Sequence, residues 1–266
     1  MTTQGSPPEW ERYDAKTRFI RFAVLLLSLV VLAISWRALN VRYDYVLTAP
    51  RELRDISRRM YPPDVAYSGE ILRPLIETVN ISILGTALAL AIAMPVAYLG
   101  ATNTTPNDFT YGLGKFIISF TRSVNVIIWA LIFVVTFGPG AMAGIFAVAM
   151  RSVGFIAKLM AEEIEEIDPT QVQGIEATGA TDLQQVIYGI IPQIKPTFIG
   201  VATYRWDINV REATVIGFVG AGGIGTNLTT SIDLFQWNRV LTILIAIFAL
   251  VIISELVSAY ARKKVS

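Results

Sequence analysis

Long apolar runs separated by polar segments dominate the pattern of hydrophobic and polar positions along the chain. Each run is close to the roughly 20 mostly apolar residues that a helix needs to cross a bilayer. The runs are continuous, whereas the strands of a membrane β-barrel would alternate apolar and polar positions over about 10 residues. The pattern therefore predicts an all-α membrane protein with six transmembrane helices, at Phe19–Trp36, Leu75–Leu99, Phe116–Phe137, Ala141–Met160, Pro196–Val219 and Val240–Tyr260.

The first run has positive residues in front of it, Arg12, Lys16 and Arg18, as a signal peptide would. Its apolar stretch is longer than the apolar region of a typical signal peptide, and no cleavage site of small residues follows it. We therefore expect Phe19–Trp36 to be retained as an anchor helix.

Between the first two runs lies a polar stretch with the period of a surface helix. Residues 50–60 place Leu53, Ile56 and Met60 on one helical face and charged residues on the others. A short helix with one apolar and one charged face is typical of a segment that lies on a membrane surface. We expect such an amphipathic helix here, on the outer surface.

Composition supports a membrane protein and excludes several kinds of chemistry. Of 266 residues, 53% are hydrophobic and 16% are charged, whereas soluble domains carry roughly 25% charged residues. The chain has no histidine and no cysteine, which excludes thiolate or imidazole metal sites, disulfides and Ser-His-Asp triads. A net charge of +1 gives no reason to expect a nucleic-acid partner. A membrane-embedded enzyme is accordingly disfavoured.

Charge counting bears on the orientation of the helices. An even number of spans puts both termini on one side of the membrane. With the termini in the cytoplasm, the cytoplasmic segments carry ten Lys and Arg residues and the opposite segments carry eight. The positive-inside rule therefore gives a small preference for cytoplasmic termini.

The polar loop before the fifth run contains residues that are typical of the starts and ends of two short helices. Asp168 followed by Pro169 is typical of a helix start, and Gly179 breaks that helix. Thr181 and Gln184 have the spacing of a capping box that starts a second helix, which Pro192 closes or kinks. This helix–glycine–helix elbow, residues 169–191, is suited to being gripped by another protein, or it is a solvated connector.

The elbow carries a resemblance to a known family. Gly179, followed 13 positions later by Pro192, resembles the cytoplasmic coupling motif of ABC importer permeases. The Glu that begins that motif is replaced here by Gln173, and its two alanines by Gly174 and Ile175. The residues from Glu176 to Ala180 instead resemble the variant found in phosphonate and phosphite importer permeases.

Other segments resemble the same group in the same order along residues 70–262, whereas residues 1–69 match only in general layout. They are Glu77-Thr78, Gly85-Thr86 and Pro95 in the second run, Trp129–Val134, the Gly138-Pro139 break with Gly144, and Arg211–Gly225.

The resemblance implies a type I ABC importer permease with a core like that of methionine permeases. It further implies a homodimer in the bacterial inner membrane with both termini cytoplasmic, two ABC ATPase subunits and a periplasmic phosphonate-binding protein. The chain has no G-x-x-x-x-G-K-[ST] motif, so we expect no cofactor in it and ATP-Mg in the partner ATPase. A permease for another small solute, such as methionine, is the alternative.

This resemblance also implies an organisation of the chain. Residues 1–69 would hold the anchor helix and the periplasmic amphipathic segment, residues 70–262 the transport core with a coupling loop at 161–192, and residues 263–266 a cytoplasmic tail. The expected ATPase-coupling residues are Gln173, Gly174, Glu176, Ala177, Thr178, Gly179, Ala180, Asp182 and Pro192.

The glycines between the fifth and sixth runs formally satisfy G-x-G-x-x-G. A dinucleotide site would also need a preceding strand in a βαβ unit, whereas a membrane helix is expected there. We interpret these glycines as permitting a sharp turn and close packing at the outer mouth. They complete a set of pathway or gate candidates with the charged residues of the fifth run: Arg205, Asp207, Arg211, Glu212, Gly217, Gly220, Gly222, Gly223 and Gly225.

Charges within the fifth run allow two interpretations. Asp207 and Arg211 are four residues apart, so they share one helical face and can pair; Arg205 and Glu212 are seven apart. One of the two arginines could offer its guanidinium to a passing phosphonate oxyanion. Alternatively, the four charges neutralise one another and hold the helix against its neighbours.

Four more polar residues fall close to predicted span ends. Glu77 and Asn80 lie near the outer end of the second span, and Arg122 and Asn125 near the inner end of the third. They are expected to be interface positions, or contacts of a hinge or gate.

Overall fold

The computed structural model describes residues 13–39 and 42–265 of the chain, and every regular element in them is helical. Residues 1–12, 40–41 and 266, which belong to the predicted N-terminal segment and C-terminal tail, lie outside the described residues. The chain divides into two units, Met1–Ser57 and Arg58–Ser266. The predicted division after residue 69 stays a prediction.

In the first unit, helix α1 runs over Ala15–Ala38, and Asp14 caps it by accepting a hydrogen bond from the backbone N–H of Ala15 (2.8 Å). None of its residues is buried. The predicted apolar helix at Phe19–Trp36 is therefore confirmed as a helix, and it is long and apolar enough to cross a membrane.

Helix α2 runs over Tyr43–Met60 and extends across the division between the units. It begins well before the predicted start and carries Pro50 in its interior. The prediction of an amphipathic helix is confirmed for residues 50–60, but its N-terminal boundary is wrong.

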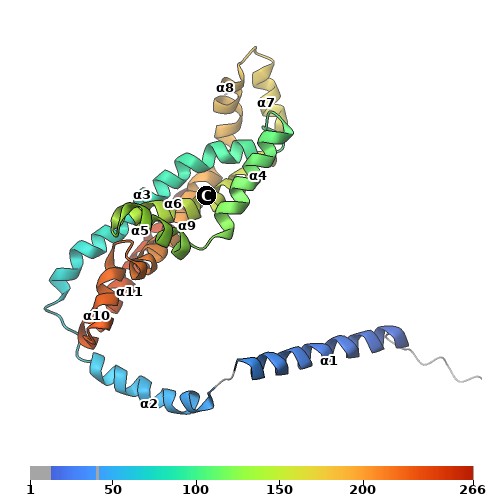
Figure 1. Cartoon of the computed structure of the whole chain (residues 1–266). Coiled ribbons are helices and arrows are strands. Elements are labelled where there is room, and N and C mark those ends of the chain that lie inside the picture. Colours follow the sequence, from blue (N-terminus) through green and yellow to red (C-terminus); the bar gives the residue numbers. More distant parts are fainter. Residues whose placement is uncertain (1–12, 40–41, 266) are drawn as a thin grey trace, which may run out of the picture. The chain divides into compact units, whose positions relative to one another are not determined.

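The second unit is a helical bundle from which a short helical pair extends at one end (Figure 1). Its elements are α3 (Ser68–Gly100), α4 (Asp108–Ser123), α5 (Val126–Phe137), α6 (Ala141–Glu165), α7 (Pro169–Glu176), α8 (Asp182–Gln185), a π-helical turn (Val186–Ile190), α9 (Ile191–Ile216), a 3₁₀ turn (Gly217–Val219), α10 (Ile224–Asp233) and α11 (Trp237–Val265).

Among the described residues, four helices are long and apolar enough to cross a membrane, namely α1, α3, α6 and α11. Two bent helix pairs raise this number to six if each pair is one span. In one pair α4 and α5 meet at 92°, and in the other the helical run Asp182–Val219 meets α10 at 41°. The six predicted runs correspond to these four helices and two pairs.

The prediction of one continuous helix at Phe116–Phe137 is wrong, because the run breaks between α4 and α5. Val124 is extended, and the Asn125 side chain accepts a hydrogen bond from the backbone N–H of Ile127 (3.0 Å). An asparagine that caps a new helix in this way ends the preceding one. The polar residues Thr121, Arg122, Ser123 and Asn125, which interrupt the apolar run, were the sequence signal for this break.

Helix α6 is the centre of the bundle, and α3, α4, α5 and α9 pack around it. Small residues line its contact with α3, where Ala89, Ala93 and Ala97 are fully buried. A methyl group on Gly85 would lie 2.7 Å from Cγ1 of Val148 in α6. Small side chains permit this close approach of two membrane helices, which gains packing contacts that lipid cannot replace.

Helices α3 and α4 also touch backbone to backbone, and this contact can be tested. A methyl group on Gly114 would lie 2.7 Å from the backbone nitrogen of Gly100, so Gly114→Ala should destabilise the bundle by about 1–3 kcal/mol through overpacking. The measurement is the unfolding midpoint in detergent. Gly112→Ala is the matched control on the same helix, because nothing lies within 4 Å of a methyl group there.

Gly112→Ala should leave the midpoint unchanged or raise it slightly, since alanine is the better helix former. Equal midpoints for the Gly114 and Gly112 variants would contradict the close contact between α3 and α4.

Candidate functional site

The elbow forms as its capping residues predict. The Asp168 side chain accepts hydrogen bonds from the backbone N–H and the hydroxyl of Thr170 (2.9 and 2.7 Å), and these two bonds lower the pKa of Asp168. The carboxylate therefore stays charged at neutral pH, next to the N-terminus of α7. Thr181 and Gln184 form the predicted capping box at the start of α8.

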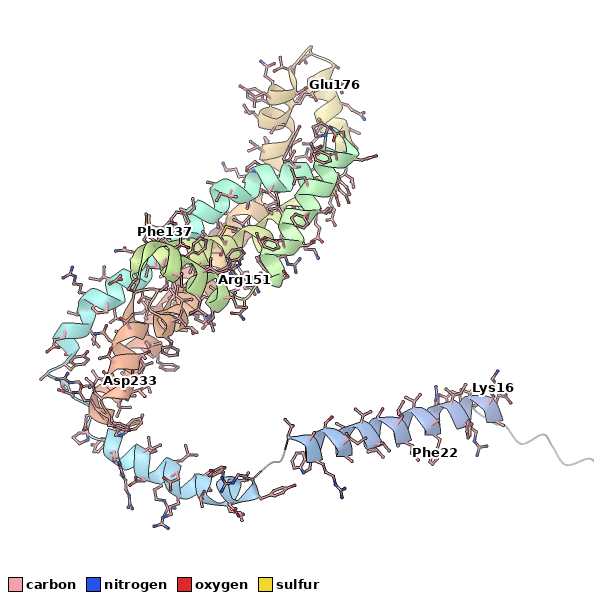
Figure 2. All side chains as sticks on the ribbon, in the orientation of Figure 1. Lys16, Phe22, Phe137, Arg151, Glu176 and Asp233 are labelled. Carbon is pink, nitrogen blue, oxygen red and sulfur yellow. The ribbon has the colours of Figure 1, made fainter. Side chains whose placement is uncertain are left out.

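The turn between α7 and α8 depends on Gly179, whose φ of +82° is in the left-handed region. Residues with a Cβ atom rarely adopt this conformation, so glycine is favoured here. The predicted break at this position is confirmed. Figure 2 shows Glu176 at the tip of the elbow, farthest from the bundle, and Asp233 at the opposite end of the same unit.

Most of the predicted coupling residues are exposed on this elbow. Gln173, Gly174, Glu176, Ala177, Thr178, Gly179 and Asp182 are exposed, Ala180 is half-buried, and Pro192 is exposed near the start of α9. They form one accessible surface outside the bundle, and their role in coupling stays a prediction.

A glutamine that sequence reasoning missed holds the base of the elbow together. The Gln193 side chain accepts a hydrogen bond from the backbone N–H of Asp168 (2.9 Å) and donates one to the carbonyl of Gly189 (2.8 Å). A methyl group on Gly189 would lie 3.3 Å from Val172 in α7, so the two arms are closely packed. The elbow is therefore tied at its base and exposed at its tip.

The prediction that Pro192 closes the second elbow helix is wrong, whereas a kink at Pro192 stays a prediction. The chain stays helical from α8 through the π-helical turn and into α9. Pro192 lies in the first turn of α9, where a missing N–H group is tolerated. The elbow and α9 are thus one continuous helical path.

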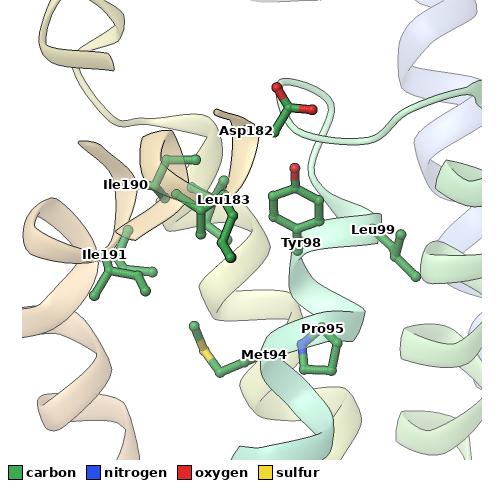
Figure 3. Close-up of a pocket in the computed structure, with 11 residues that line it drawn as sticks. Met94, Pro95, Tyr98, Leu99, Asp182, Leu183, Ile190 and Ile191 are labelled. Atoms are coloured by element: carbon green, nitrogen blue, oxygen red, sulfur yellow. The ribbon is translucent and has the colours of Figure 1, made fainter. Parts of the chain in front are cut away.

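An apolar cavity of about 570 Å³ lies beneath the elbow. Met94, Pro95 and Tyr98 of α3 face the elbow residues Leu183 and Ile190 across it (Figure 3). Ile190 on the elbow side of this space is 6% exposed and belongs to the buried cluster that contains Val96 and Ala97. The space therefore lies at the edge of that core.

The two charge pairs expected in the fifth run are both present in α9. Arg205 Nη2 lies 3.0 Å from Glu212 Oε2, and Arg211 forms an ion pair with Asp207. The second oxygen of Asp207 accepts a hydrogen bond from the hydroxyl of Ser254 in α11 (2.8 Å). Both carboxylates are thus paired within the bundle.

The two arginines differ in their surroundings. The Arg205 side chain is 4% exposed, lies 5.4 Å from the centre of the Phe155 ring and donates to Ser152 Oγ (2.9 Å). The Arg211 side chain is 44% exposed. Arg205 therefore has the contacts of a residue that holds helices together, whereas Arg211 remains accessible.

Three helices are joined by a buried polar chain that the sequence did not reveal. Asn209 of α9 is fully buried; it donates to Thr86 of α3 (2.8 Å) and accepts from Ser152 of α6 (3.0 Å). Since Ser152 also bonds Arg205, the chain continues to the buried ion pair. The one sequence signal for this chain of hydrogen bonds was Asn209 itself, a polar residue within an apolar run.

The glycines at residues 217–225 form a tightly packed turn between α9 and α10. The Glu77 side chain accepts a hydrogen bond from the backbone N–H of Gly223 (3.2 Å), and the Thr78 hydroxyl accepts one from Ile224 (2.8 Å). A methyl group on Gly217 would lie 2.6 Å from Cα of Gly225. The prediction that these glycines permit a sharp turn and close packing is confirmed, and their place at the outer mouth stays a prediction.

The remaining glycines of this turn agree with that interpretation. Gly220, Gly222 and Gly223 all have φ between +76° and +85°. Helix α9 and a 3₁₀ turn precede them, and no strand occurs in residues 13–39 and 42–265, so the βαβ unit of a dinucleotide site is missing from this region. Their role as a gate stays a prediction.

Comparison with known proteins gives one family and several relatives. Residues 89–266 match the family described as the binding-protein-dependent transport system inner membrane component. The chain is 37% identical over 234 residues to a phosphite transport system permease protein of Stutzerimonas stutzeri, which covers 88% of this chain and 85% of that protein. A putative phosphite permease of the same organism is 33% identical over 249 residues, 94% of this chain and 88% of that protein.

The fold matches solved structures as well. A chain of the MetNI methionine ABC transporter in an inward-facing conformation superposes with a TM-score of 0.66 at 22% sequence identity, covering 76% of this chain and 99% of that chain. At this level of identity the match establishes the fold alone, and it agrees with the expected methionine-permease-like core.

The buried ion pair leads to a stability prediction. Arg205→Gln leaves Glu212, whose side chain is 20% exposed, without its cation, which should cost about 3–5 kcal/mol. Lys115→Gln is the control, because Lys115 and Glu165 form a partly exposed pair at 3.8 Å and such pairs contribute about 1 kcal/mol or less.

The measurement is again the unfolding midpoint in detergent. Arg205→Gln should lower it much more than Lys115→Gln does. Equal small shifts for the two variants would show that the buried pair does not stabilise the bundle.

Proposed function

Because this chain belongs to the family of binding-protein-dependent transport system inner membrane components, we propose that it is the membrane permease of an ATP-driven importer for phosphite or a related phosphorus oxyanion. The observation that carries the proposal is the similarity to phosphite permeases over almost the whole chain. The exposed elbow and the charged residues of α9 support the same function.

Two ATPase subunits would dock on the elbows of two copies of this chain. Support comes from the geometry of the elbow, which is exposed at Glu176 and tied at its base by Gln193. A tied base transmits force better than a flexible loop. Since the sequence has no G-x-x-x-x-G-K-[ST] motif, ATP and Mg²⁺ would bind in the ATPase partner.

The permease would work as a homodimer with the pathway between its copies. A periplasmic binding protein would deliver the solute at the end of the bundle that holds residues 217–225. The elbow would then face the cytoplasm, together with both termini. This orientation agrees with the small excess of Lys and Arg counted on that side.

Transport would proceed by alternating access. Closure of the ATPase dimer would move the elbows, and α9 would carry the movement inward because the helical path from α8 to α9 is continuous. The cavity beneath the elbow leaves room for α8 to shift against α3. Hydrolysis would reset the bundle to its other packing.

A methionine permease is the alternative within the same fold. The methionine transporter chain shares the fold at 22% identity, whereas the phosphite permease is 37% identical. An oxyanion as the solute would also explain the exposed arginines better than a zwitterionic amino acid would. The phosphorus oxyanion is therefore the better-supported solute.

The test is ATP hydrolysis by the complex of permease, ATPase and binding protein in lipid. We expect binding protein loaded with phosphite or a phosphonate to stimulate hydrolysis several-fold, because the loaded protein favours the closed ATPase dimer. The control is the same binding protein without solute. Stimulation by methionine with its binding protein, and none by phosphorus oxyanions, would contradict the proposal.

A further inference from the structure

Two arginines beside the α4–α5 bend have no part in the contacts described so far. Arg122, the penultimate residue of α4, is exposed, and Arg151 of α6 is half-buried. A methyl group on Gly154 would lie 2.7 Å from Cγ of Arg122, so this side chain begins directly against α6. Arg151 lies one turn before Gly154 on the same helix, and Figure 2 labels it there.

Both arginines lie at the middle level of the bundle rather than at its ends. Arg151 is ten residues from Ala141 and 14 from Glu165, which corresponds to about 15 and 21 Å along the helix. The expectation that Arg122 lies near the inner end of a span stays a prediction. The third run breaks beside it, so Arg122 is held at the depth of Arg151.

The charges around this level do not cancel. At this level α4, α6 and α9 carry four arginines, Arg122, Arg151, Arg205 and Arg211, and two carboxylates, Asp207 and Glu212. The other carboxylates of these helices, Asp108, Glu162, Glu163 and Glu165, lie in the first turn of α4 and the last turn of α6. Asp207 and Glu212 each pair with an arginine of α9. Within the described part of the chain, no carboxylate lies within 4 Å of the Arg122 or Arg151 side chain. Two positive charges are left over, and that of Arg151 also repels Arg205.

A structural role explains only part of this arrangement. Arg151 Nη1 donates a hydrogen bond to the backbone carbonyl of Arg122 (3.1 Å), as a cation at a helix C-terminus does. That bond uses one of the five N–H donors of its guanidinium. Within residues 13–39 and 42–265, the guanidinium of Arg122 makes no hydrogen bond or ion pair. A guanidinium group that faces lipid costs free energy, so charged residues at this depth face water or other protein.

We propose that Arg122 and Arg151 form an oxyanion site of the transport pathway, level with the middle of the bundle, for the phosphorus oxyanion of the proposed function. Two arginines on neighbouring helices suit an anion that has several oxygens, because each guanidinium can donate paired hydrogen bonds. Both side chains are partly exposed on this subunit rather than enclosed in its core, which would allow an anion to leave. Permeation needs this balance between entry and release.

The inference rests on the proposed function, and one experiment separates the two. Transport of radiolabelled phosphite and ATP hydrolysis are measured together, in proteoliposomes that contain the complete complex. Arg122→Gln combined with Arg151→Gln should lower the phosphite transported per ATP by about tenfold, because charge-assisted contacts to the anion are lost. Hydrolysis stimulated by the loaded binding protein should stay near the wild-type level.

The single variant Arg122→Gln keeps the test valid if the double variant misfolds. Arg122 is exposed, so its replacement leaves no buried group without a partner. This variant should lower transport per ATP as well. Replacing both arginines by lysine keeps the charges but not the paired donors, and should restore part of the transport. The matched control is Lys158→Gln on α6, whose partner Glu162 is at the surface; it should transport like wild type.

Unchanged transport per ATP in the double glutamine variant would overturn the oxyanion site alone. So would an equal loss in the glutamine and lysine variants, which would indicate a packing role. A wild-type complex that transports no phosphorus oxyanion would contradict the proposed function, and the inference with it.

Discussion

The structure depends on one constraint, which is that polar groups inside an apolar bundle must find partners within it. Asn209 is the clearest case, because it is fully buried and bonds both α3 and α6. Through Ser152 the same chain of bonds reaches the ion pair of Arg205 with Glu212. These contacts have defined partners and directions, whereas the apolar contacts around them do not. They therefore fix how α9 sits against the central helix.

Helix α9 joins the three features on which the functional account relies. The elbow continues into it at one end, the charge pairs lie along its middle, and the glycine turn of residues 217–225 follows its other end. The elbow is tied by Gln193, and the cavity beneath it leaves space on the α3 side. In the proposed mechanism, a displacement of the elbow would therefore move α9 rather than compress the elbow.

Local signals predicted local structure well. The caps at Asp168 and Thr181, the break at Gly179 and the i,i+4 pair of Asp207 and Arg211 all follow from short-range chemistry. The break at Asn125 was missed although polar residues at 121–123 and 125 interrupt the run there, because the apolar stretches on both sides together have the length of one span. The partners of Asn209 and the proximity of Arg122 to Arg151 were missed for another reason. These residues come together only through the packing of helices that are distant in sequence.

The central claim is that motion of the elbow reaches the interior through α9. The chain has no cysteine, so Ile208→Cys, at a half-buried position of α9, gives a single thiol whose reaction with a maleimide can be timed in the purified complex. The account predicts that trapping the ATPase with ATP and vanadate changes this rate several-fold relative to the nucleotide-free complex. Identical rates in both states, in a complex that hydrolyses ATP, would contradict it.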